Sequence, residues 1–222
     1  RMVASQRNRA FLLGDQTGVG KGRVLAAIAR AHLRADPRNR VLYFTESAPI
    51  NVPDVCRDLD DVGAWNEISP AFLTSGSVYE HVARDADTGE MTTDVWKSLP
   101  AARRREIYES LSWPEDNDLV ITTYSQFNSR EGDVRSEWIS SAIDEHTLVI
   151  LDEAHNAINP KSNTGRNLRA AIDAAGPANV VYGTATPYRN PAGMDLYAPL
   201  LPQSEDGRYQ AVLDNIKDGG EV

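Results

Sequence analysis

The stretch FLLGDQTGVGKGRVLAAI, residues 11–28, joins a short apolar run to an amphipathic pattern through a glycine-rich turn. This pattern predicts a buried strand over 9–13 and a helix over 21–33. Glycines let a backbone wrap closely around a ligand, and the first turn of a helix adds partial positive charge. The lysine at position 21 can reach a bound phosphate, so the stretch favours a phosphate-binding loop over a plain strand-to-helix connection.

Further apolar runs follow along the chain and alternate with helical patterns. Several runs are apolar on both faces, which is typical of parallel strands covered by helices on both sides of a sheet. The sequence therefore predicts a three-layer α/β fold with a mainly parallel central sheet. The additional predicted strands span residues 40–46, 70–75, 118–124, 147–152 and 179–185, and the additional predicted helices span 51–64, opened by Pro53 and closed by Gly63, and 164–176.

Two stretches depart from this alternation. Residues 84–117 are rich in charge, and we interpret them as an insertion on the rim of the sheet that holds two short helical segments. Its arginine run, 103–105, is expected on a solvated helix face rather than against nucleic acid. Residues 202–222 lose the apolar rhythm and read as a linker toward a further part of the protein. The predicted organisation is one lobe over 1–201 followed by that linker.

The composition narrows the function classes. The length of 222 residues suits one large domain. A net charge of −9 and a pI of about 4.9 argue against a protein that binds nucleic acid through bulk positive charge, although a local groove stays compatible. No apolar run approaches 18 residues, so we expect no membrane role and a cytoplasmic protein, or a nuclear one in a eukaryote. The single cysteine, Cys56, excludes an internal disulfide and is interpreted as a structural thiol.

A second motif lies at the end of another predicted strand. In LVILDEAHNA, residues 148–157, the apolar run ends in Asp152 and Glu153. Carboxylates at the tip of a buried strand are costly unless they have a partner or a chemical role. Asp152 can hold magnesium and Glu153 can accept a proton from an attacking water. A helix N-cap at Asp152 is the structural alternative, which the coexisting phosphate loop makes less favoured.

A third motif, YGTATPYRN over 182–190, again follows a predicted strand. Its hydroxyls, on Thr184 and Thr186, are expected beside the same site, because the carboxyl ends of parallel strands meet at one edge of the sheet. Alone, the motif reads as a turn ended by proline. As the third element of the series, it indicates a nucleotide-hydrolysing site.

Taken together, GDQTGVGKGR, TTYSQF, LDEAHNA and TATPYRN resemble, in this order, the motifs of the first RecA-like lobe of superfamily-2 helicases and translocases. The segments DEAHNAINPKSNTGRNLRAA and TATPYRN are similar to Swi/Snf-type ATPases. GDQTGVGKGR and RDLDDVGA resemble the strawberry notch family more closely, over about residues 1–200. His155 stands in D-E-A-H where animal members tend to have D-E-C-H, which fits a microbial or viral relative.

The resemblance implies a role for each motif residue. ATP is expected as the ligand, with Lys21 as the charge clamp, Asp152 as the magnesium ligand and Glu153 as the general base. His155 is expected to relay the nucleotide state to Thr184 and Thr186. The phosphates are expected to lie against the loop residues Thr17, Gly18, Val19, Gly20, Lys21, Gly22 and Arg23.

One position departs from the usual phosphate loop. The residue after the lysine is normally Ser or Thr, whose hydroxyl holds Mg²⁺, and here it is Gly22. The resemblance implies that this glycine is normal in the strawberry notch family. Mg²⁺ needs few protein ligands, so Asp152 and the phosphates are expected to hold it, with Thr17 or Thr186 nearby. A degenerate site is the alternative.

The resemblance also implies partners. Segments 44–49 and 122–127 would face nucleic acid, most simply duplex DNA, through its phosphate backbone. A second RecA-like lobe is expected to supply an arginine finger. The implied function is an ATP-driven helicase or translocase, and the alternative is a nucleotide-dependent interaction module that does not translocate. The candidate DNA-contacting residues are Thr122, Thr123, Ser125 and Gln126.

Overall fold

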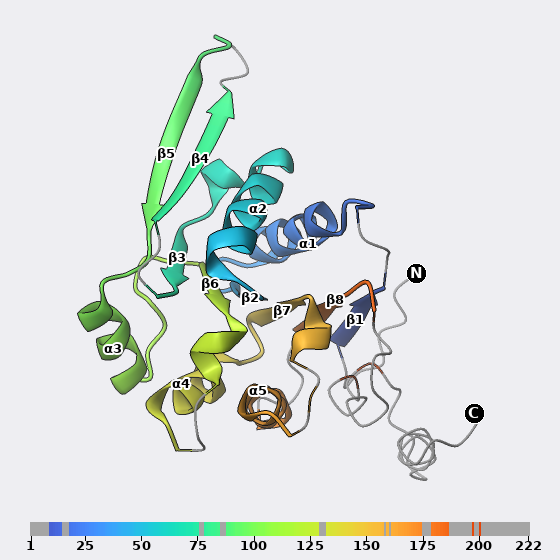
Figure 1. The fold of residues 1–222 in the computed structure, drawn as a ribbon, viewed down its shortest axis with the longest axis vertical. Coiled ribbons are helices and arrows are strands. Elements are labelled where there is room, and N and C mark those ends of the chain that lie inside the picture. Colours follow the sequence, from blue (N-terminus) through green and yellow to red (C-terminus); the bar gives the residue numbers. More distant parts are fainter. Residues whose placement is uncertain are drawn as a thin grey trace.

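The computed structural model describes residues 9–14, 18–75, 78–84, 88–128, 132–157, 159, 161–174, 179–186, 197 and 200. Its centre is a six-stranded sheet with the order β1-β8-β7-β2-β6-β3, and all of its pairs are parallel (Figure 1). The strands are β1 (Arg9–Leu13), β2 (Arg40–Thr45), β3 (Pro70–Leu73), β6 (Leu119–Thr123), β7 (Thr147–Asp152) and β8 (Asn179–Gly183).

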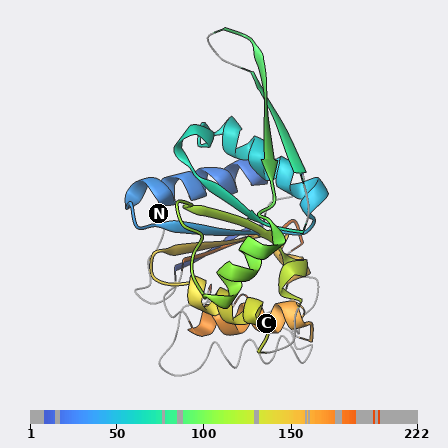
Figure 2. The same ribbon diagram turned by 90° about the vertical axis from the view of Figure 1, so that its left-hand side faces the viewer.

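Helices cover both faces of this sheet, which confirms the predicted three-layer α/β architecture. Figure 2 shows one layer of helices above the strands and a second layer below them. Apolar runs that are buried on both faces, such as Leu119–Thr123, require this double cover because neither face meets water. The first layer holds α1 (Lys21–Ala35) and α2 (Ala48–Asp61), and the second holds α3 (Ala101–Glu109), α4 (Val134–Ala142) and α5 (Asn163–Ala174).

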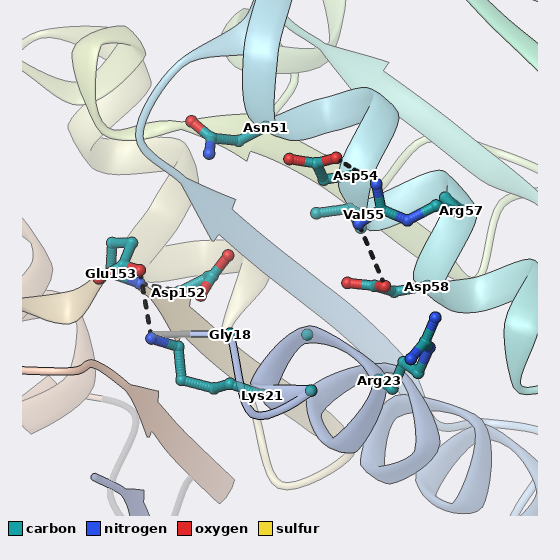
Figure 3. A pocket seen from close by; sticks show the side chains of 12 residues that line it. Gly18, Lys21, Arg23, Asn51, Asp54, Val55, Arg57, Asp58, Asp152 and Glu153 are labelled. Carbon is teal, nitrogen blue, oxygen red and sulfur yellow. Dashed lines mark hydrogen bonds and ion pairs between the residues drawn. The ribbon is translucent and has the colours of Figure 1, made fainter. Parts of the chain in front are cut away.

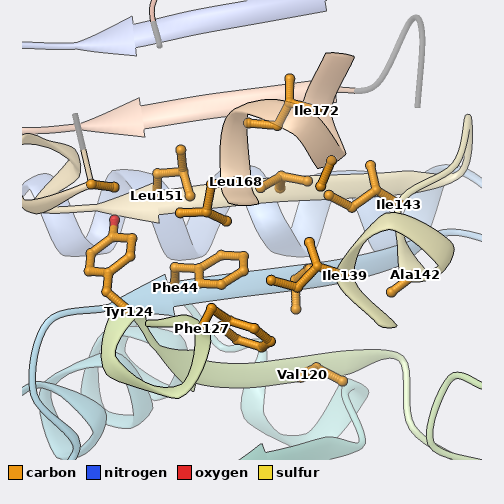
Figure 4. Close-up of a cluster of buried hydrophobic side chains, with 14 of the residues drawn as sticks. Phe44, Val120, Tyr124, Phe127, Ile139, Ala142, Ile143, Leu151, Leu168 and Ile172 are labelled. Atoms are coloured by element: carbon orange, nitrogen blue, oxygen red, sulfur yellow. The ribbon is translucent and has the colours of Figure 1, made fainter. Parts of the chain in front are cut away.

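Each layer encloses its own hydrophobic cluster. Between the sheet and α1 and α2, Leu25, Cys56 and Leu59 are fully buried. Burial raises the pKa of the Cys56 thiol to about 12, which agrees with its interpretation as a structural thiol. Between the sheet and the other helices, Phe127 stacks on Trp138 with ring centroids 6.1 Å apart. Figure 4 shows part of this second cluster.

Strand register brings the carboxyl ends of the strands to one edge. Asp152 at the end of β7 is the register partner of Gly183 at the end of β8, and Gly183 also pairs with Leu13 at the end of β1. In the middle of the sheet, Thr45 of β2 pairs with Thr123 of β6. The loops that follow these ends therefore form one surface, where α/β proteins of this kind bind ligands.

The charged segment between β3 and β6 differs from the prediction. Instead of two short helices, it contains an antiparallel hairpin, β4 (Val78–Arg84) and β5 (Met91–Lys97), followed by α3. The hairpin projects away from the body of the domain (Figure 1). Trp96 anchors its base, with its ring centroid 3.9 Å from that of Trp65. Threonine, valine and tryptophan in β5 favour a strand over a helix, and their effect exceeds that of the surrounding charges.

Two further helices differ from expectation. α2 begins at Ala48, three residues before the predicted start, with proline in its first turn and Pro53 inside the helix. Asn51 fixes this start because its Oδ1 accepts a hydrogen bond of 3.0 Å from the backbone N–H of Ser47. α4 was not predicted, since its nine residues are too few for a clear apolar period. Its start is capped by Asp133, which accepts from the backbone N–H of Arg135.

The arginines of α3 make local contacts. Arg103 pairs with Glu106 at 2.8 Å, and Arg105 pairs with Glu109 at 2.7 Å, both along the exposed helix. Arg104 donates to the backbone carbonyls of Thr74 and Leu99 and holds α3 to the end of β3. These contacts are those of a solvated helix face with one structural arginine. The predicted linker, 202–222, lies outside the described residues.

Candidate nucleotide site

The turn between β1 and α1 needs its glycines for their backbone conformation and not because a larger side chain would clash. Gly18 and Gly20 both have φ of 86°, in the left-handed region that other residues adopt only with strain. A Cβ at either glycine would meet nothing within 4 Å. Gly20 stands at the N-cap of α1, so the turn delivers the chain directly into the first turn of that helix. Thr17, predicted to belong to the loop, lies outside the described residues.

Lys21, the first residue of α1, is turned inward. Its side chain is only 9% exposed, and its Nζ lies 3.2 Å from Oε1 of Glu153 (Figure 3). A buried ammonium group is stable only with a partner, and the carboxylate provides one. The predicted phosphate clamp and the predicted general base are therefore in direct contact, although 131 residues separate them in the chain.

Glu153 owes its position to an unusual backbone. With φ of 50° and ψ of 48°, it is one of three non-glycine residues with positive φ among the described residues. Such a conformation costs about 1–3 kcal/mol and is commonly found at functional sites. It turns the chain sharply after β7, and the backbone N–H of Glu153 donates to Oδ1 of Asp152 at 3.0 Å. Tyr124 steadies the same turn by donating its hydroxyl to the carbonyl oxygen of Asp152 at 2.7 Å.

Two carboxyl groups of the site have raised pKa values. Burial and the neighbouring charge of Glu153 raise the pKa of Asp152 to about 6, although Lys21 lowers it in part. Burial also raises the pKa of Asp58, which lies on α2 on the other side of the pocket. Both groups sit where a bound cation would favour their charged forms. The pocket is lined by Gly18, Gly20, Lys21, Gly22, Arg23, Asn51, Asp54, Val55, Arg57, Asp58, Asp152 and Glu153 (Figure 3).

His155 links this pocket to the third motif. Its Nδ1 lies 3.0 Å from Oγ1 of Thr184 and 3.2 Å from Oε2 of Glu153. Thr184 is fully buried, and its backbone N–H donates to the carbonyl oxygen of Leu13, at the start of the glycine-rich connection. Thr186 joins through its backbone N–H, which donates to Oγ1 of Thr184 at 3.1 Å, while its own side chain is exposed. The geometry connects all three, with Thr184 at the centre.

The four candidate DNA-contacting residues are not equally available. Thr122 is fully buried and donates its hydroxyl to the carbonyl oxygen of Leu73, so its side chain faces the interior of the domain. Thr123 is 2% exposed, and its hydroxyl lies 2.9 Å from that of Ser125. Ser125 is exposed, and Gln126 donates to Oγ of Ser75 at 2.8 Å. Only Ser125 and Gln126 offer side chains at the surface.

Sequence patterns did not identify the residues that α2 and β8 bring to the site. Asn51 lies outside the quoted motifs, and Asp58 stands in RDLDDVGA, a segment that indicated the family but no role in the site. Gly183 allows close approach, because a Cβ there would lie 2.9 Å from Cδ1 of Leu25 and 3.5 Å from Oδ1 of Asp152. Such residues are identified by packing between elements that are far apart in the chain, so a single sequence carries no local signal for them.

A parallel sheet of this order, with a glycine-rich loop before α1 and an acidic strand end facing its lysine, defines a P-loop nucleotide-binding domain. The chain belongs to the strawberry notch-like branch of these proteins: the family described as P-loop containing NTP hydrolase pore-1 matches residues 1–216, nearly the whole chain.

Two similar proteins have strawberry notch in their names. The chain is 27% identical over 201 residues to "Protein strawberry notch homolog" of Caenorhabditis elegans, an alignment that covers 87% of this chain. It is 26% identical over 201 residues to "Protein strawberry notch" of Drosophila melanogaster, covering 83% of this chain. In each case the alignment covers 10% of the relative, so the chain spans about a tenth of the length of these proteins. Among the described residues, no helix is both long and apolar enough to cross a membrane.

Proposed function

We propose that this chain is the ATP-binding and ATP-hydrolysing lobe of a superfamily-2 helicase-like translocase that acts on nucleic acid. The observation that carries the proposal is the contact between Lys21 and Glu153 at 3.2 Å. The contact supports the proposal because phosphoryl transfer to water needs a cation for the phosphates and a carboxylate for the water, and Lys21 and Glu153 would supply both from one wall of the pocket.

Phosphate binding follows from the loop. Gly20, Lys21 and Gly22, at the start of α1, line the pocket, where a helix N-terminus offers backbone N–H groups without helical partners and Lys21 adds a positive charge. When the nucleotide enters, its phosphates compete with Glu153 for the Lys21 ammonium. Lys21 then serves the phosphates, and the released Glu153 carboxylate is free to orient a water molecule and accept its proton.

The site also fits a magnesium ion. Asp152 offers a carboxylate at the end of β7, where burial raises its pKa and a bound cation would favour its charged form. Asp152 would hold Mg²⁺ directly or through a water molecule. The ion, when bound, neutralises charge on the phosphate oxygens. His155 contacts both Glu153 and Thr184, so it would transmit a change at the phosphates to the third motif, residues 182–190.

The partners are proposed as duplex DNA and a second RecA-like lobe. Ser125 and Gln126 lie after β6, at the same carboxyl edge of the sheet as the nucleotide pocket. Their polar side chains suit phosphate oxygens, which give contact without sequence readout. A second lobe would add an arginine finger, a group that contributes roughly 10³ to 10⁵ in rate to related enzymes.

One observation favours an interaction module that binds nucleotide without translocation. The chain has a net charge of −9, and the described part of its candidate DNA face has buried Thr122 and Thr123. A DNA-binding surface is normally basic. Such a module would change its protein contacts with nucleotide state and would be insensitive to DNA.

The two proposals differ in one measurement. Steady-state ATP hydrolysis by the full-length protein is measured with and without duplex DNA, and the same protein with Lys21→Ala sets the background. The motor proposal expects turnover above that background and a clear rise when DNA is added. Turnover that DNA leaves unchanged contradicts the motor and supports the module, and no turnover above background contradicts hydrolysis itself.

A further inference from the structure

Gly22, the residue after the phosphate-binding lysine, lies against an acidic side chain from another helix. A Cβ built on Gly22 would overlap Oδ2 of Asp58 and would lie 2.9 Å from its Cγ. The two helices that carry them, α1 and α2, pack side by side on one face of the sheet (Figures 1 and 3). Asp58 therefore occupies the space in which the side chain of any other residue at position 22 would begin.

This space has a known use in phosphate loops. A serine or threonine after the lysine normally places its hydroxyl oxygen on Mg²⁺ beside the phosphates. In this chain, position 22 has no side chain, and an oxygen atom enters the same region from α2 instead. The side chain of Asp58 is 15% exposed, so it faces the pocket and not the solvent.

The charges of the pocket require a cation when phosphates are present. Lys21 is paired with Glu153, and the Arg23 side chain is paired with Asp61 at 2.7 Å. Arg57 is held by Asp54 at 2.7 Å and reaches Asp58 only at 3.5 Å. A triphosphate entering beside Asp58 would meet repulsion unless a positive ion lay between them.

Building on the nucleotide site proposed above, we propose that Asp58 supplies the oxygen ligand for Mg²⁺ that phosphate loops ordinarily take from a serine or threonine hydroxyl. In this proposal, the carboxylate of Asp58 replaces the missing hydroxyl at position 22, and only glycine at that position leaves room for it. Asp58 acts either directly on the ion or through one of its water molecules.

In this proposal, the protein side chains alone do not complete the coordination of Mg²⁺. Among the described residues, no group of three or more histidine, cysteine or acidic side chains is arranged to hold a metal ion. Mg²⁺ usually keeps several waters and binds one or two carboxylates together with substrate phosphates. Asp58 and Asp152, which approach from opposite sides of the pocket, fit that requirement (Figure 3). The ion is then expected to bind together with nucleotide and only weakly without it.

The test measures how much Mg²⁺ tightens nucleotide binding in the full-length protein. The dissociation constant of a fluorescent ATP analogue is determined in EDTA and in excess Mg²⁺, and the ratio of the two constants is compared between variants. Mn²⁺ bound in the nucleotide complex is followed by electron paramagnetic resonance. Asp58→Asn, which keeps the shape of the side chain, is expected to lower the ratio about 10-fold or more and to weaken the Mn²⁺ signal.

Three further variants distinguish a metal ligand from a general effect of negative charge. Asp60→Asn removes the same charge from the same helix at a residue that does not line the pocket, and it is expected to leave the ratio unchanged. Gly22→Ser alone should lower the ratio because its Cβ displaces Asp58. Gly22→Ser combined with Asp58→Ala is expected to restore it, since the hydroxyl then returns to its ordinary place.

Each outcome has one meaning. An Mg²⁺ effect that survives Asp58→Asn, or that falls equally with Asp60→Asn, overturns the role of Asp58 and leaves the nucleotide site standing. Failure of the unmodified protein to bind the analogue in either buffer overturns the nucleotide site and this inference together. Thermal melting of each variant shows whether a loss of binding reflects unfolding.

Discussion

Lys21 and Glu153 neutralise each other on one wall of the pocket, with Nζ and Oε1 3.2 Å apart. One residue begins α1, and the other follows β7 in a left-handed turn. In the proposed mechanism each must leave the other to act, the lysine to bind phosphate and the carboxylate to bind water. The described ion pair is thus the state expected before nucleotide binds, in which Lys21 neutralises the carboxylate of Glu153.

Lys21→Ala is expected to abolish nucleotide binding and to lower stability modestly. The alanine removes the phosphate contact, and it leaves the Glu153 carboxylate, 26% exposed, without its partner. Because that carboxylate still reaches water, the loss of unfolding free energy should be about 1 kcal/mol. Titration with nucleotide and chemical denaturation measure the two effects. Lys161→Ala, at an exposed position, is the matched control, and unchanged affinity in Lys21→Ala would contradict the phosphate-loop assignment.

Glu153→Gln in the full-length protein should bind ATP and turn it over at least ~100-fold more slowly. The amide keeps the size of the side chain but cannot accept the proton of the attacking water. It also releases Lys21 from an ion pair, so ATP affinity should stay the same or increase. Single-turnover hydrolysis and nucleotide titration on the same preparation separate these effects. Hydrolysis at the normal rate would show that another group is the base.

Asp152→Asn should stabilise the protein more at pH 8 than at pH 5. Because the folded state raises the pKa of Asp152 to about 6, it binds more protons than the unfolded state between about pH 4 and 6, and the contribution of this group to stability is lost as pH rises through that range. Asparagine carries no charge, so it avoids this loss. The gain at pH 8 should not exceed about 3 kcal/mol, since one pKa unit corresponds to about 1.4 kcal/mol. Denaturation curves at both pH values provide the comparison, and an equal effect at both would refute the assignment.

The same carboxylate should control magnesium-dependent binding. Protonated Asp152 is a poor ligand for a cation, so the tightening of ATP binding by Mg²⁺ should weaken as pH falls below about 6. Binding measured in EDTA serves as the control because it does not involve the ion. A pH dependence that is identical in both buffers would place the effect elsewhere.

Gly183→Ala is expected to destabilise the protein by about 1–3 kcal/mol. The new methyl group would lie 2.9 Å from Cδ1 of Leu25, a fully buried side chain of α1 that must shift within its cluster to make room. Since α1 carries Lys21, nucleotide affinity should fall as well. Combining it with Leu25→Val creates space for the methyl group, so the double variant should lose less stability than the two single losses predict. Strictly additive losses would contradict this contact.

Much of the fold was predictable because each signal is local. The runs that form β1 and β7 were placed at their observed bounds, 9–13 and 147–152, because buried parallel strands are apolar without interruption. The hairpin β4 and β5 was missed since its charges obscure the pattern of β5, and its anchoring contact between Trp65 and Trp96 joins separate segments. Short helices such as α4 give too few repeats for a period to be recognised.

The candidate site also combines features that the sequence predicts with features that only the structure reveals. Lys21, Asp152 and Glu153 stand in motifs whose residue order indicates their chemistry. Their mutual contact and the left-handed turn at Glu153 required coordinates. The interior position of Thr122 could not be foreseen either, since a threonine near a strand end reads the same whether its hydroxyl faces solvent or the carbonyl of Leu73.

The position of β1 has a consequence for how the protein is made. In the described sheet, β1 pairs only with β8, so Leu13 finds its register partner about 170 residues later in the chain, at Gly183. During synthesis, the amino-terminal strand must therefore wait unpaired until almost the whole domain has left the ribosome. The phosphate loop, which follows β1, becomes competent only at that moment. ATP binding by a nascent chain would thus report the completion of the domain, and chains interrupted before residue 179 should lack it.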